Sequence, residues 1–417
     1  MLRAYRFQLR CKPAQERALR RCAGGLRWVW NQALAEQKAR YARGEKFASY
    51  VDMAKWLTAW RNAPGTAWLA EGPIHPQQQA LRRLEEAFKR FFAKAGGYPS
   101  FKRRGQEPGI RFPDPKQFAL DQGNERAKLP KLGWVRLRQS RAVAGELRNV
   151  SLRQQGAKWF CSIQVEQPDV LAAAGLQPSL GLDVGVALFA AGSDGRKIQP
   201  LAALKRQQQR LRRYQKAVSR KVKGSANRKK AVKRLGTLHR RIAHQRADWL
   251  HKLSTELADQ HPVIAAEDLK VKAMTASATR TAEKPGKNVK AKAGLNRAIL
   301  DAAWSEFARQ LDYKLQARGG ELIKVPAPYT SQACSVCGHT EKQNRASQAR
   351  FKCVACGHAE NADVNAAKNI LAAGHAVWAE RKLESAACGG AVSRRRTARI
   401  SGAAPVKQEP TEGCGSP

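Results

Sequence analysis

Residues 329–370 read YTSQACSVCGHTEKQNRASQARFKCVACGHAENADVNAAKNI and contain two Cys-x-x-Cys pairs separated by fifteen residues. Such a turn supplies two thiolates from one backbone bend, and a glycine follows each pair where the tight turn favours one. A redox-active pair would occur once, near a βαβ unit, rather than twice at the spacing of a zinc ribbon. The pattern therefore predicts a zinc ion bound by four thiolates, those of Cys334, Cys337, Cys353 and Cys356.

A zinc ion with four thiolate ligands has no open position, so we expect this metal to be structural. His339 and His358 each lie two residues after a Cys-x-x-Cys turn, and replacement of one thiolate by either imidazole is the alternative. The other cysteines are scattered and odd in number, which indicates reduced thiols rather than a disulfide framework. They are Cys11, Cys22, Cys161, Cys388 and Cys414.

Acidic residues occur at three places in otherwise apolar or helical surroundings. Asp183 interrupts the strand-like run LGLDVGV, Glu267 and Asp268 end the run VIAAEDL, and Asp363 precedes VNAAKNI in the position of a helix N-cap. A buried lone carboxylate is costly unless it is paired or binds a cation. Three carboxylates that meet at one end of a sheet could hold two divalent cations, one activating water and one stabilising the leaving oxygen of a phosphodiester.

Each of these acids also has a simpler interpretation, as a turn residue, a salt-bridge partner or a helix cap. The choice between Glu267 and Asp268 is open on physical grounds alone. Alternation along the strand from Ile264 puts Glu267 on the face opposite Ala266 and Asp268, which favours Glu267.

The chain has 417 residues and a formal net charge of +44, from 77 Lys+Arg against 33 Asp+Glu. An excess of this size favours a polyanionic partner, with nucleic acid ahead of an anionic membrane surface. No apolar run approaches the ~20 residues of a membrane-spanning helix, and the start MLRAYRFQLR lacks the apolar region of a signal peptide. We therefore expect a cytoplasmic, nucleoid-associated protein without a membrane partner.

The N-terminal part of the chain alternates between strand-like and helical patterns. Residues 3–10 alternate apolar and basic side chains, and residues 13–92 carry apolar side chains at helical spacing. The tryptophans of this helical region are expected in its core rather than as base-stacking platforms; they are Trp28, Trp30, Trp56, Trp60 and Trp68. Short strands follow at residues 109–112, 133–137, 150–153 and 159–165.

The C-terminal part begins after an expected linker at residues 167–179. Residues 201–247 contain 17 Lys/Arg and no acidic residue, and Gly224-Ser225 divides them into two amphipathic helices. The second helix should bury a stripe of Val232, Leu235, Leu238, Ile242, Trp249 and Leu253. Residues 270–294 are expected to be mobile, residues 295–318 to form one helix, residues 321–325 a strand, and residues from about 383 to be disordered.

These motifs resemble the OrfB/TnpB proteins of bacterial insertion sequences, which are related to the type V CRISPR effectors. The matching segments are Gly181–Gly185, Ala266–Leu269, Tyr98–Arg104, Tyr329–Gly338 and Asp363–Ile370. The resemblance covers about residues 1–375, and the order of the motifs is more specific than any one of them.

The resemblance implies an α/β fold with additional mainly β and α modules. The expected parts are an RNase H-like (RuvC) nuclease domain with an inserted zinc ribbon and an N-terminal wedge β-barrel with a helical recognition insertion. The corresponding residues are 1–12 and 96–166 for the wedge, 13–95 for the recognition domain, 180–330 and 358–375 for the nuclease, 331–357 for the ribbon and 376–417 for a mostly disordered tail.

The resemblance further implies an RNA-guided DNA endonuclease in which Asp183, Glu267 and Asp363 bind magnesium and cut DNA. The expected partners are a guide RNA from the end of the element and double-stranded target DNA, with one protein chain in the ribonucleoprotein. The basic helices would then contact an RNA–DNA heteroduplex. Two alternatives remain open: a DNA-only transposase or resolvase with the same nuclease fold, and a non-catalytic zinc-ribbon repressor.

Overall fold

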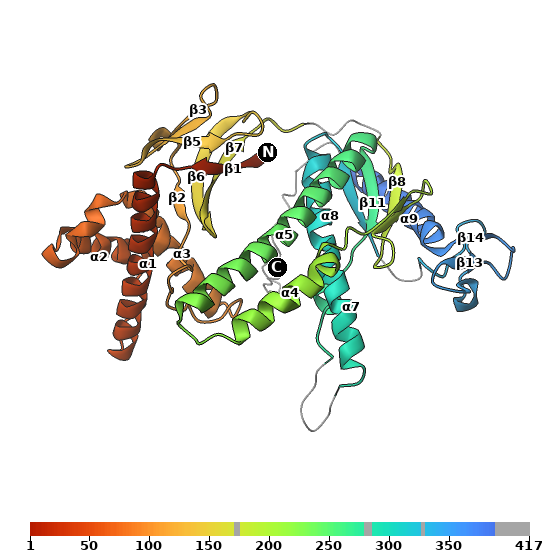
Figure 1. Cartoon of the computed structure of the whole chain (residues 1–417). Coiled ribbons are helices and arrows are strands. Elements are labelled where there is room, and N and C mark those ends of the chain that lie inside the picture. Colours follow the sequence, from red (N-terminus) through yellow and green to blue (C-terminus); the bar gives the residue numbers. More distant parts are fainter. Residues whose placement is uncertain (171–175, 279–285, 327–329, 388–417) are drawn as a thin grey trace, which may run out of the picture. The chain divides into compact units, whose positions relative to one another are not determined.

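The computed structural model describes residues 1–170, 176–278, 286–326 and 330–387, with side chains as far as residue 381 (Figure 1). The chain divides into two compact units. The first consists of Met1–Leu171 and Ala203–Ala247, and the second of Ala172–Ala202 and Asp248–Pro417. No helix of the described residues is long and apolar enough to cross a membrane.

The first unit contains an antiparallel sheet of seven strands in the order β2-β6-β7-β1-β5-β4-β3. Alternating side chains of β1, namely Tyr5, Phe7 and Leu9, are buried, as the sequence pattern predicts for a strand with one face on a core. The strands are β1 (Leu2–Arg10), β2 (Ile110–Phe112), β3 (Ala119–Asp121), β4 (Arg126–Leu129), β5 (Gly133–Arg138), β6 (Glu146–Gln155) and β7 (Lys158–Glu166).

This sheet confirms the predicted strands and adds β3 and β4, which the sequence analysis missed. Its edges are β2 and β3, so the hydrogen-bonded ladder is open, unlike that of a closed barrel. Phe112 of β2 and Ala127 of β4 lie in the same buried cluster, so strands near both edges share one core. By its pairing the expected β-barrel is therefore an open sheet.

Between β1 and β2 the chain forms a helical bundle, as predicted. Its elements are α1 (Pro13–Ala42), α2 (Tyr50–Asn62), the 3₁₀ helix η1 (Pro64–Glu71) and α3 (Ile74–Phe92). Val29, Leu57 and Leu81 are buried in its core, with Trp30 beside them. Trp28, Trp56 and Trp60 are partly buried against this core, and Trp28 packs edge-on against Trp60 and Trp68. Trp68 departs from the prediction, with 43% of its surface exposed.

Two long basic helices, α4 (Ala203–Ser219) and α5 (Ala226–Gln260), follow the strands of the second unit in sequence. Gly224, with φ of +90°, lies in the turn between them, which confirms the predicted division. Leu238 and Ile242 are buried as predicted, whereas Val232 is exposed and Ala231 is buried in its place. Residues 203–247 group with the first unit, although the sequence analysis assigned them to the nuclease domain.

The second unit is built on a five-stranded sheet in the order β10-β9-β8-β11-β12. The neighbours β8, β11 and β12 are parallel, while β9 and β10 run antiparallel to their neighbours. Parallel strands are buried on both faces, which explains their nearly continuous apolar sequences. The strands are β8 (Leu180–Val184), β9 (Ala190–Gly192), β10 (Lys197–Ile198), β11 (Val263–Glu267) and β12 (Glu321–Val325).

Helices cover both faces of this sheet. On one face Ile264 packs with Leu257 of α5 and with Phe307 of α8 (Trp304–Gln316). On the other face Ala265 packs with Ile370 of α9 (Ala362–Ala387). The side chains of successive residues of β11 therefore face different layers of helices.

Several boundaries differ from the sequence-based expectations. The helix expected over residues 295–318 is two helices, α7 (Val289–Ala302) and α8, because Ala303 adopts φ of +58°. This bend lets Ile299 and Trp304 enter the same core. The segment 270–294, expected to be mobile, contains α6 (Val271–Met274) and the start of α7, and its residues 279–285 lie outside the described residues.

Two boundaries near the C-terminus also differ. The ribbon extends past residue 357, since β14 (Ala359–Asn361) pairs with β13 (Arg350–Lys352). Helix α9 continues to Ala387, beyond the expected end of the nuclease domain at residue 375, so residues 376–387 are helical rather than tail. The expected disorder of residues 388–417 concerns positions outside the described residues.

Helix α9 lies unusually close to the sheet at two glycines. A Cβ on Gly181 of β8 would lie 2.1 Å from the Ala367 carbonyl oxygen and 2.7 Å from the Leu371 nitrogen. A Cβ on Gly374 of α9 would lie 2.5 Å from the Ala265 Cβ. Glycine at both positions allows helix backbone to rest on strand backbone, and this contact fixes how far along the sheet α9 lies.

We predict that Gly181→Ala lowers the free energy of unfolding of the second unit by about 1–3 kcal/mol, because backbone atoms of α9 must move to admit the methyl group. Thermal unfolding measures the change. Gly294→Ala in α7 is the matched control, since its nearest neighbour is Arg297 Nη2 at 4.0 Å. The control should be neutral or stabilising by up to about 1 kcal/mol; equal effects of the two changes would contradict the close contact.

Candidate functional site

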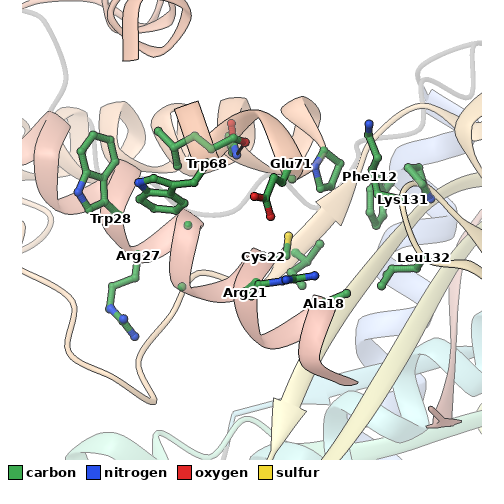
Figure 2. A pocket seen from close by; sticks show the side chains of 18 residues that line it. Ala18, Arg21, Cys22, Arg27, Trp28, Trp68, Glu71, Phe112, Lys131 and Leu132 are labelled. Carbon is green, nitrogen blue, oxygen red and sulfur yellow. Dashed lines mark hydrogen bonds between the residues drawn. The ribbon is translucent and has the colours of Figure 1, made fainter. Parts of the chain in front are cut away.

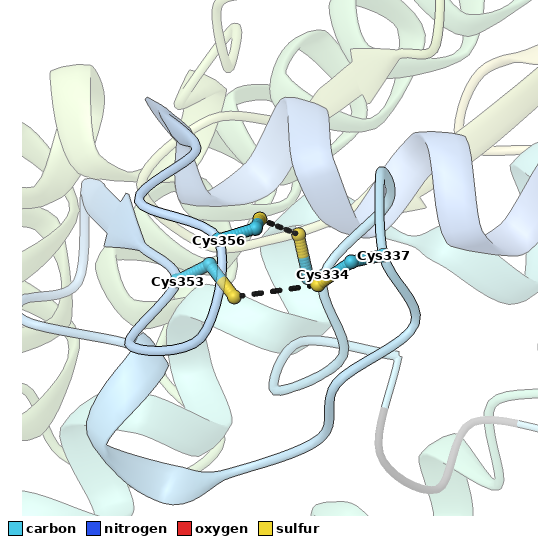
Figure 3. A group of neighbouring side chains, drawn as sticks. All are labelled: Cys334, Cys337, Cys353 and Cys356. Atoms are coloured by element: carbon cyan, nitrogen blue, oxygen red, sulfur yellow. Dashed lines mark hydrogen bonds between the residues drawn. The ribbon is translucent and has the colours of Figure 1, made fainter.

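The four predicted zinc ligands meet at one point of the second unit (Figure 3). Their sulfur atoms all lie within 4.8 Å of one another. The Sγ atoms of Cys334 and Cys356 are 3.7 Å apart, and those of Cys337 and Cys353 are 3.6 Å apart. Tetrahedral zinc with Zn–S bonds of 2.3 Å needs sulfur atoms about 3.8 Å apart. The four thiols therefore have the spacing that a zinc ion requires.

The backbone of the ribbon makes the same turn twice. The amide of Cys334 donates to His339 O, and the amide of Cys353 donates to His358 O. Gly338 and Gly357 both adopt φ of +74°, the conformation that the sequence pattern predicts for these positions. The Sγ of Cys353 accepts hydrogen bonds from the amides of Cys356 and Ala355, and the former is the main cause that lowers the pKa of this thiol to about 6.

Neither histidine takes the place of a thiolate. His339 Nε2 lies 3.1 Å from Glu341 Oε2, and His358 Nε2 lies 3.5 Å from Glu360 Oε2. Four sulfur atoms form the group of potential metal ligands, and no histidine joins it in the part of the chain that the structure describes. The geometry thus agrees with four-thiolate coordination rather than with the alternative of an imidazole ligand.

Asp183 and Glu267 lie side by side because of the strand register. Leu182 of β8 pairs in register with Ala266 of β11, so the next residues of these parallel strands, Asp183 and Glu267, are also neighbours. Adjacent strands are about 4.8 Å apart, and in-register residues of parallel strands point to the same face. That face is the one that carries Ala265 and is covered by α9.

Asp363 reaches the same place from α9. The helix packs on Gly181 through Ala367, one turn after Asp363. Gly374, two turns later, packs on Ala265, the register partner of Gly181, and a Cβ there would lie 3.8 Å from Pro178 Cβ, before the start of β8. The N-terminal turn of the helix is therefore directed toward the carboxyl ends of β8 and β11. The prediction that Asp363 caps this helix was wrong: Asn361 Oδ1 accepts from the amides of Asp363 and Val364. Since Asn361 provides the cap, the Asp363 carboxylate is free for other contacts.

The electrostatics of Asp183 show that the three acids form one cluster. Burial, the largest cause, and the neighbouring charges of Glu267 and Asp363 together raise its pKa to about 7, while Arg345 opposes the shift. Burial also raises the pKa of Glu267, against a hydrogen bond from Thr330 Oγ1 at 2.9 Å. The potential ligand atoms of the three acids do not all lie within 4.8 Å of one another. The site therefore gathers repelling carboxylates, a donor set that suits hard divalent cations.

The structure separates Glu267 from its acidic neighbour. Asp268 is 57% exposed at its side chain, and its nearest cation is Lys324 Nζ at 3.8 Å. Glu267 instead lies on the face of β11 that faces α9, beside Asp183. The alternation from Ile264 is thus confirmed as a guide to the face, because Ile264 lies in the opposite layer.

Sequence reasoning missed Arg345, a ribbon residue beside the acids. Its Nη2 lies 3.5 Å from Asp363 Oδ1, and Arg345 is the cation that most directly lowers the pKa of Asp183. Its guanidinium donates to Gln348 O, which holds it on the ribbon. The sequence contains 77 Lys+Arg, so no pattern distinguishes Arg345 from the other basic residues. Its position between the cysteine pairs is the one feature that could have indicated a place near the acids.

The first unit contains a separate cavity of about 570 Å³ between α1, η1 and the loop after β4 (Figure 2). Trp28 and Trp68 line it, together with Arg21, Arg27 and Glu71. None of the three clustered carboxylates lines this cavity, which has a single acidic residue in its wall. The candidate chemistry therefore belongs to the acid cluster of the second unit, not to this cavity.

Three segments of the chain match described families. Residues 162–278 match the OrfB family of IS605 elements, described as "Probable transposase", and residues 304–370 match the TNB domain of Cas12f1-like proteins. Residues 1–46 match the helix-turn-helix domain of the OrfB family. Over that last segment the structure has strand β1 followed by one continuous helix, α1.

Two relatives extend the match to nearly the whole chain. "Putative RNA-guided DNA endonuclease InsQ" of Escherichia coli K12 is 47% identical over 99% of this chain and 98% of its own length. The chain belongs to the OrfB/TnpB family. A second relative, "Putative RNA-guided DNA endonuclease" of Streptomyces pristinaespiralis, is 34% identical over 97% of this chain and 96% of its own length.

The fold of this OrfB/TnpB protein is similar to that of the protein in a cryo-EM structure of a Cas12f1–sgRNA–target DNA complex. The TM-score is 0.54 at 15% sequence identity, covering 84% of this chain and 81% of the other. At this identity the likeness concerns the fold alone.

The raised pKa of Asp183 predicts a pH-dependent stability. Its folded pKa of about 7 exceeds its ordinary value of 3.8, so between these values the folded state keeps a proton that the unfolded chain has lost. Stability from this group is therefore greatest below about pH 4 and falls as the pH rises toward 7. Without added magnesium, Asp183→Asn should stabilise the protein at pH 8 by about 1–3 kcal/mol, allowing for water access.

Urea unfolding at pH 4.5 and pH 8, with zinc retained, measures this difference. The advantage of Asp183→Asn should shrink at the lower pH, where the wild-type carboxyl is protonated. Added magnesium at pH 8 should stabilise the wild type more than the variant. An advantage that is independent of pH would show that Asp183 is not the repelled, buried carboxylate described above.

Proposed function

We propose that this protein is an RNA-guided DNA endonuclease of a bacterial insertion sequence, with a RuvC-like nuclease site in its second unit. The observation that carries the proposal is the cluster of Asp183, Glu267 and Asp363 at the carboxyl ends of β8 and β11. The two relatives aligned over nearly the full chain, both named as RNA-guided DNA endonucleases, support it. The guide RNA, target DNA and magnesium are parts of the proposal.

The cluster explains why this site suits phosphodiester hydrolysis. Asp183, Glu267 and Asp363 would hold magnesium ions, which supply an activated water and neutralise charge on the leaving oxygen. Without a cation, burial and mutual repulsion raise the pKa of Asp183 to about 7. Thr330 orients the Glu267 carboxylate through its hydroxyl. The Arg345 guanidinium provides a positive charge next to Asp363, where a phosphate oxygen of the bound strand can receive its hydrogen bonds.

The basic helices are the proposed contacts for nucleic acid. Residues 203–247 carry all 17 Lys/Arg of the acid-free segment that the sequence analysis identified. Cations of this kind bind phosphates without reading sequence, so base pairing with a guide would supply the specificity. The zinc ribbon would be structural, and one chain would form the protein part of the ribonucleoprotein. Action on chromosomal DNA would place the protein in the bacterial cytoplasm, at the nucleoid.

The repressor and the DNA-only transposase or resolvase differ from the proposed function in the residues and partners that they require. A zinc-ribbon repressor has no need of three carboxylates in one partly buried cluster, and that cluster weighs against it. A DNA-only transposase or resolvase could use the same carboxylates without RNA. Only the requirement for a guide separates it from the proposed function.

We predict that the protein purified from cells expressing the flanking sequence of its element carries a defined RNA and cuts DNA matched to that RNA. Sequencing of the bound RNA identifies the guide. The same protein, freed of RNA and given back either that RNA or a scrambled one, should cut only with the former. Equal cutting without RNA would favour the DNA-only transposase, and no cutting under any condition would favour the repressor.

Two adjacent acids provide a matched test of the nuclease site. Glu267→Gln removes one carboxylate of the cluster and should reduce cleavage by about 10²-fold or more, since a metal ligand is lost. Asp268→Asn removes an exposed carboxylate paired with Lys324 and should leave cleavage within about 2-fold. Both variants should bind guide and target as the wild type does. The site is misassigned if Asp268→Asn has the larger effect, or if Glu267→Gln abolishes binding as well.

A further inference from the structure

Two asparagines of α9 fasten the zinc ribbon to the helix that carries Asp363. Asn365 is fully buried. Its Oδ1 accepts from the amide of Ser335 at 3.0 Å, and its Nδ2 donates to Ala333 O at 2.8 Å. Ser335 and Ala333 are the residues on either side of the zinc ligand Cys334. One side-chain amide therefore holds the backbone of the first Cys-x-x-Cys turn from both sides.

Asn369 continues this contact one turn later on the same face of α9. Its Nδ2 donates to Ala333 O at 2.7 Å and to Thr330 O at 2.8 Å. Thr330 in turn donates its hydroxyl to Glu267 Oε1 at 2.9 Å. We call Asn365 and Asn369 the asparagine clamp. A continuous series of hydrogen bonds thus runs from the backbone around Cys334, through the clamp and Thr330, to a carboxylate of the acid cluster.

The ribbon also contributes directly to the acid cluster. Arg345 lies between the two cysteine pairs, and its guanidinium lies 3.5 Å from Asp363 Oδ1. Asp363 is two residues before Asn365 on the first turn of α9. The place of Arg345 relative to the carboxylates therefore depends on how the ribbon sits on α9. The buried hydrogen bonds of Asn365 hold the first Cys-x-x-Cys turn there, and the Ala362 amide, bonded to Ala349 O, holds the segment after Arg345.

We propose that Asn365 and Asn369 are positioning residues that use the zinc-bound ribbon to set the geometry of the carboxylate cluster for divalent cations. Zinc would shape the first Cys-x-x-Cys turn, and the clamp would transmit that shape to Glu267, Asp363 and Arg345. A buried amide that satisfies both a donor and an acceptor suits this role, because neither partner can move without leaving a buried polar group unpaired. The inference rests on the proposed nuclease function of this cluster.

The test compares Asn365→Ala and Asn369→Ala with Lys368→Met. Lys368 lies between them on α9 and reaches the ribbon through a partly exposed ion pair with Glu360, at 2.6 Å. The clamp variants should keep one zinc per chain and bind target DNA within about 2-fold of the wild type. The magnesium concentration for half-maximal cleavage should rise by about 10- to 100-fold, the usual effect of losing a partner that orients metal ligands. Lys368→Met should resemble the wild type.

A second measurement is independent of cleavage. Thermal stabilisation of the nucleic-acid-free protein by manganese should be large in the wild type and in Lys368→Met, and weak in both clamp variants. If Asn365→Ala does not fold, the test uses Asn369→Ala alone, because the Asn369 side chain is only half-buried. Loss of zinc from the folded clamp variants would overturn the proposal, because the clamp would then serve ribbon folding. An unchanged magnesium requirement would overturn it as well.

The outcome for the wild type separates this inference from the proposed function. If the guided wild type cuts DNA and the clamp variants match it at every magnesium concentration, only the clamp proposal fails. A different result would be a wild type that does not cut DNA but is stabilised by manganese more than the clamp variants are. The nuclease assignment would then fail, and the proposal that the clamp sets the cation site would stand.

Discussion

The close contact between α9 and the sheet at Gly181 is the constraint on which the candidate site depends. The Ala367 carbonyl occupies space that any Cβ at Gly181 would need. The N-terminal end of α9 extends from Gly181 toward the carboxyl ends of β8 and β11. Its first turn therefore lies beside Asp183. The third carboxylate is thus placed by backbone packing far more than by its own contacts. A helix held further from the sheet would leave Asp363 away from the other two acids.

The acid cluster and the packing beneath it have opposite effects on stability. Apolar residues on both faces of β11 stabilise the second unit. At the ends of the same strands, burial and repulsion raise the pKa of Asp183 and Glu267. The free energy gained by packing therefore offsets the cost of holding carboxylates in a poorly solvated group. A bound cation removes that cost, so cation binding and stability are linked at this site.

The parts of the site that sequence could predict are those set by local spacing. Each cysteine pair, with the glycine that follows it, forms one turn whose two ligands are near neighbours in sequence. The spacing of the cysteines therefore predicts the zinc ligands directly. The face occupied by Glu267 followed from alternation within one strand. The side-by-side placement of Asp183 and Glu267 is different, since it depends on the register of two strands whose acids are 84 positions apart (267 − 183) in the chain. The residue pattern offered the meeting of these acids at one end of a sheet beside simpler interpretations, and the resemblance to a family favoured it.

The residues that sequence reasoning missed act through tertiary contacts. Arg345 is one of 77 basic residues, and Asn365 belongs to a motif that the sequence analysis used only to recognise the family. Both owe their importance to the position of the ribbon on α9. The same is true of the bend at Ala303, where burial of Ile299 and Trp304 in one core overrides a continuous helical pattern. The helix cap is Asn361 rather than Asp363 for a related reason. The Asn361 side chain accepts from two backbone amides and leaves Asp363, the second residue of α9, beside the other acids. Asparagines thus take the structural roles on both sides of Asp363, capping the helix and holding the ribbon, and the carboxylate between them remains available to the proposed cation site.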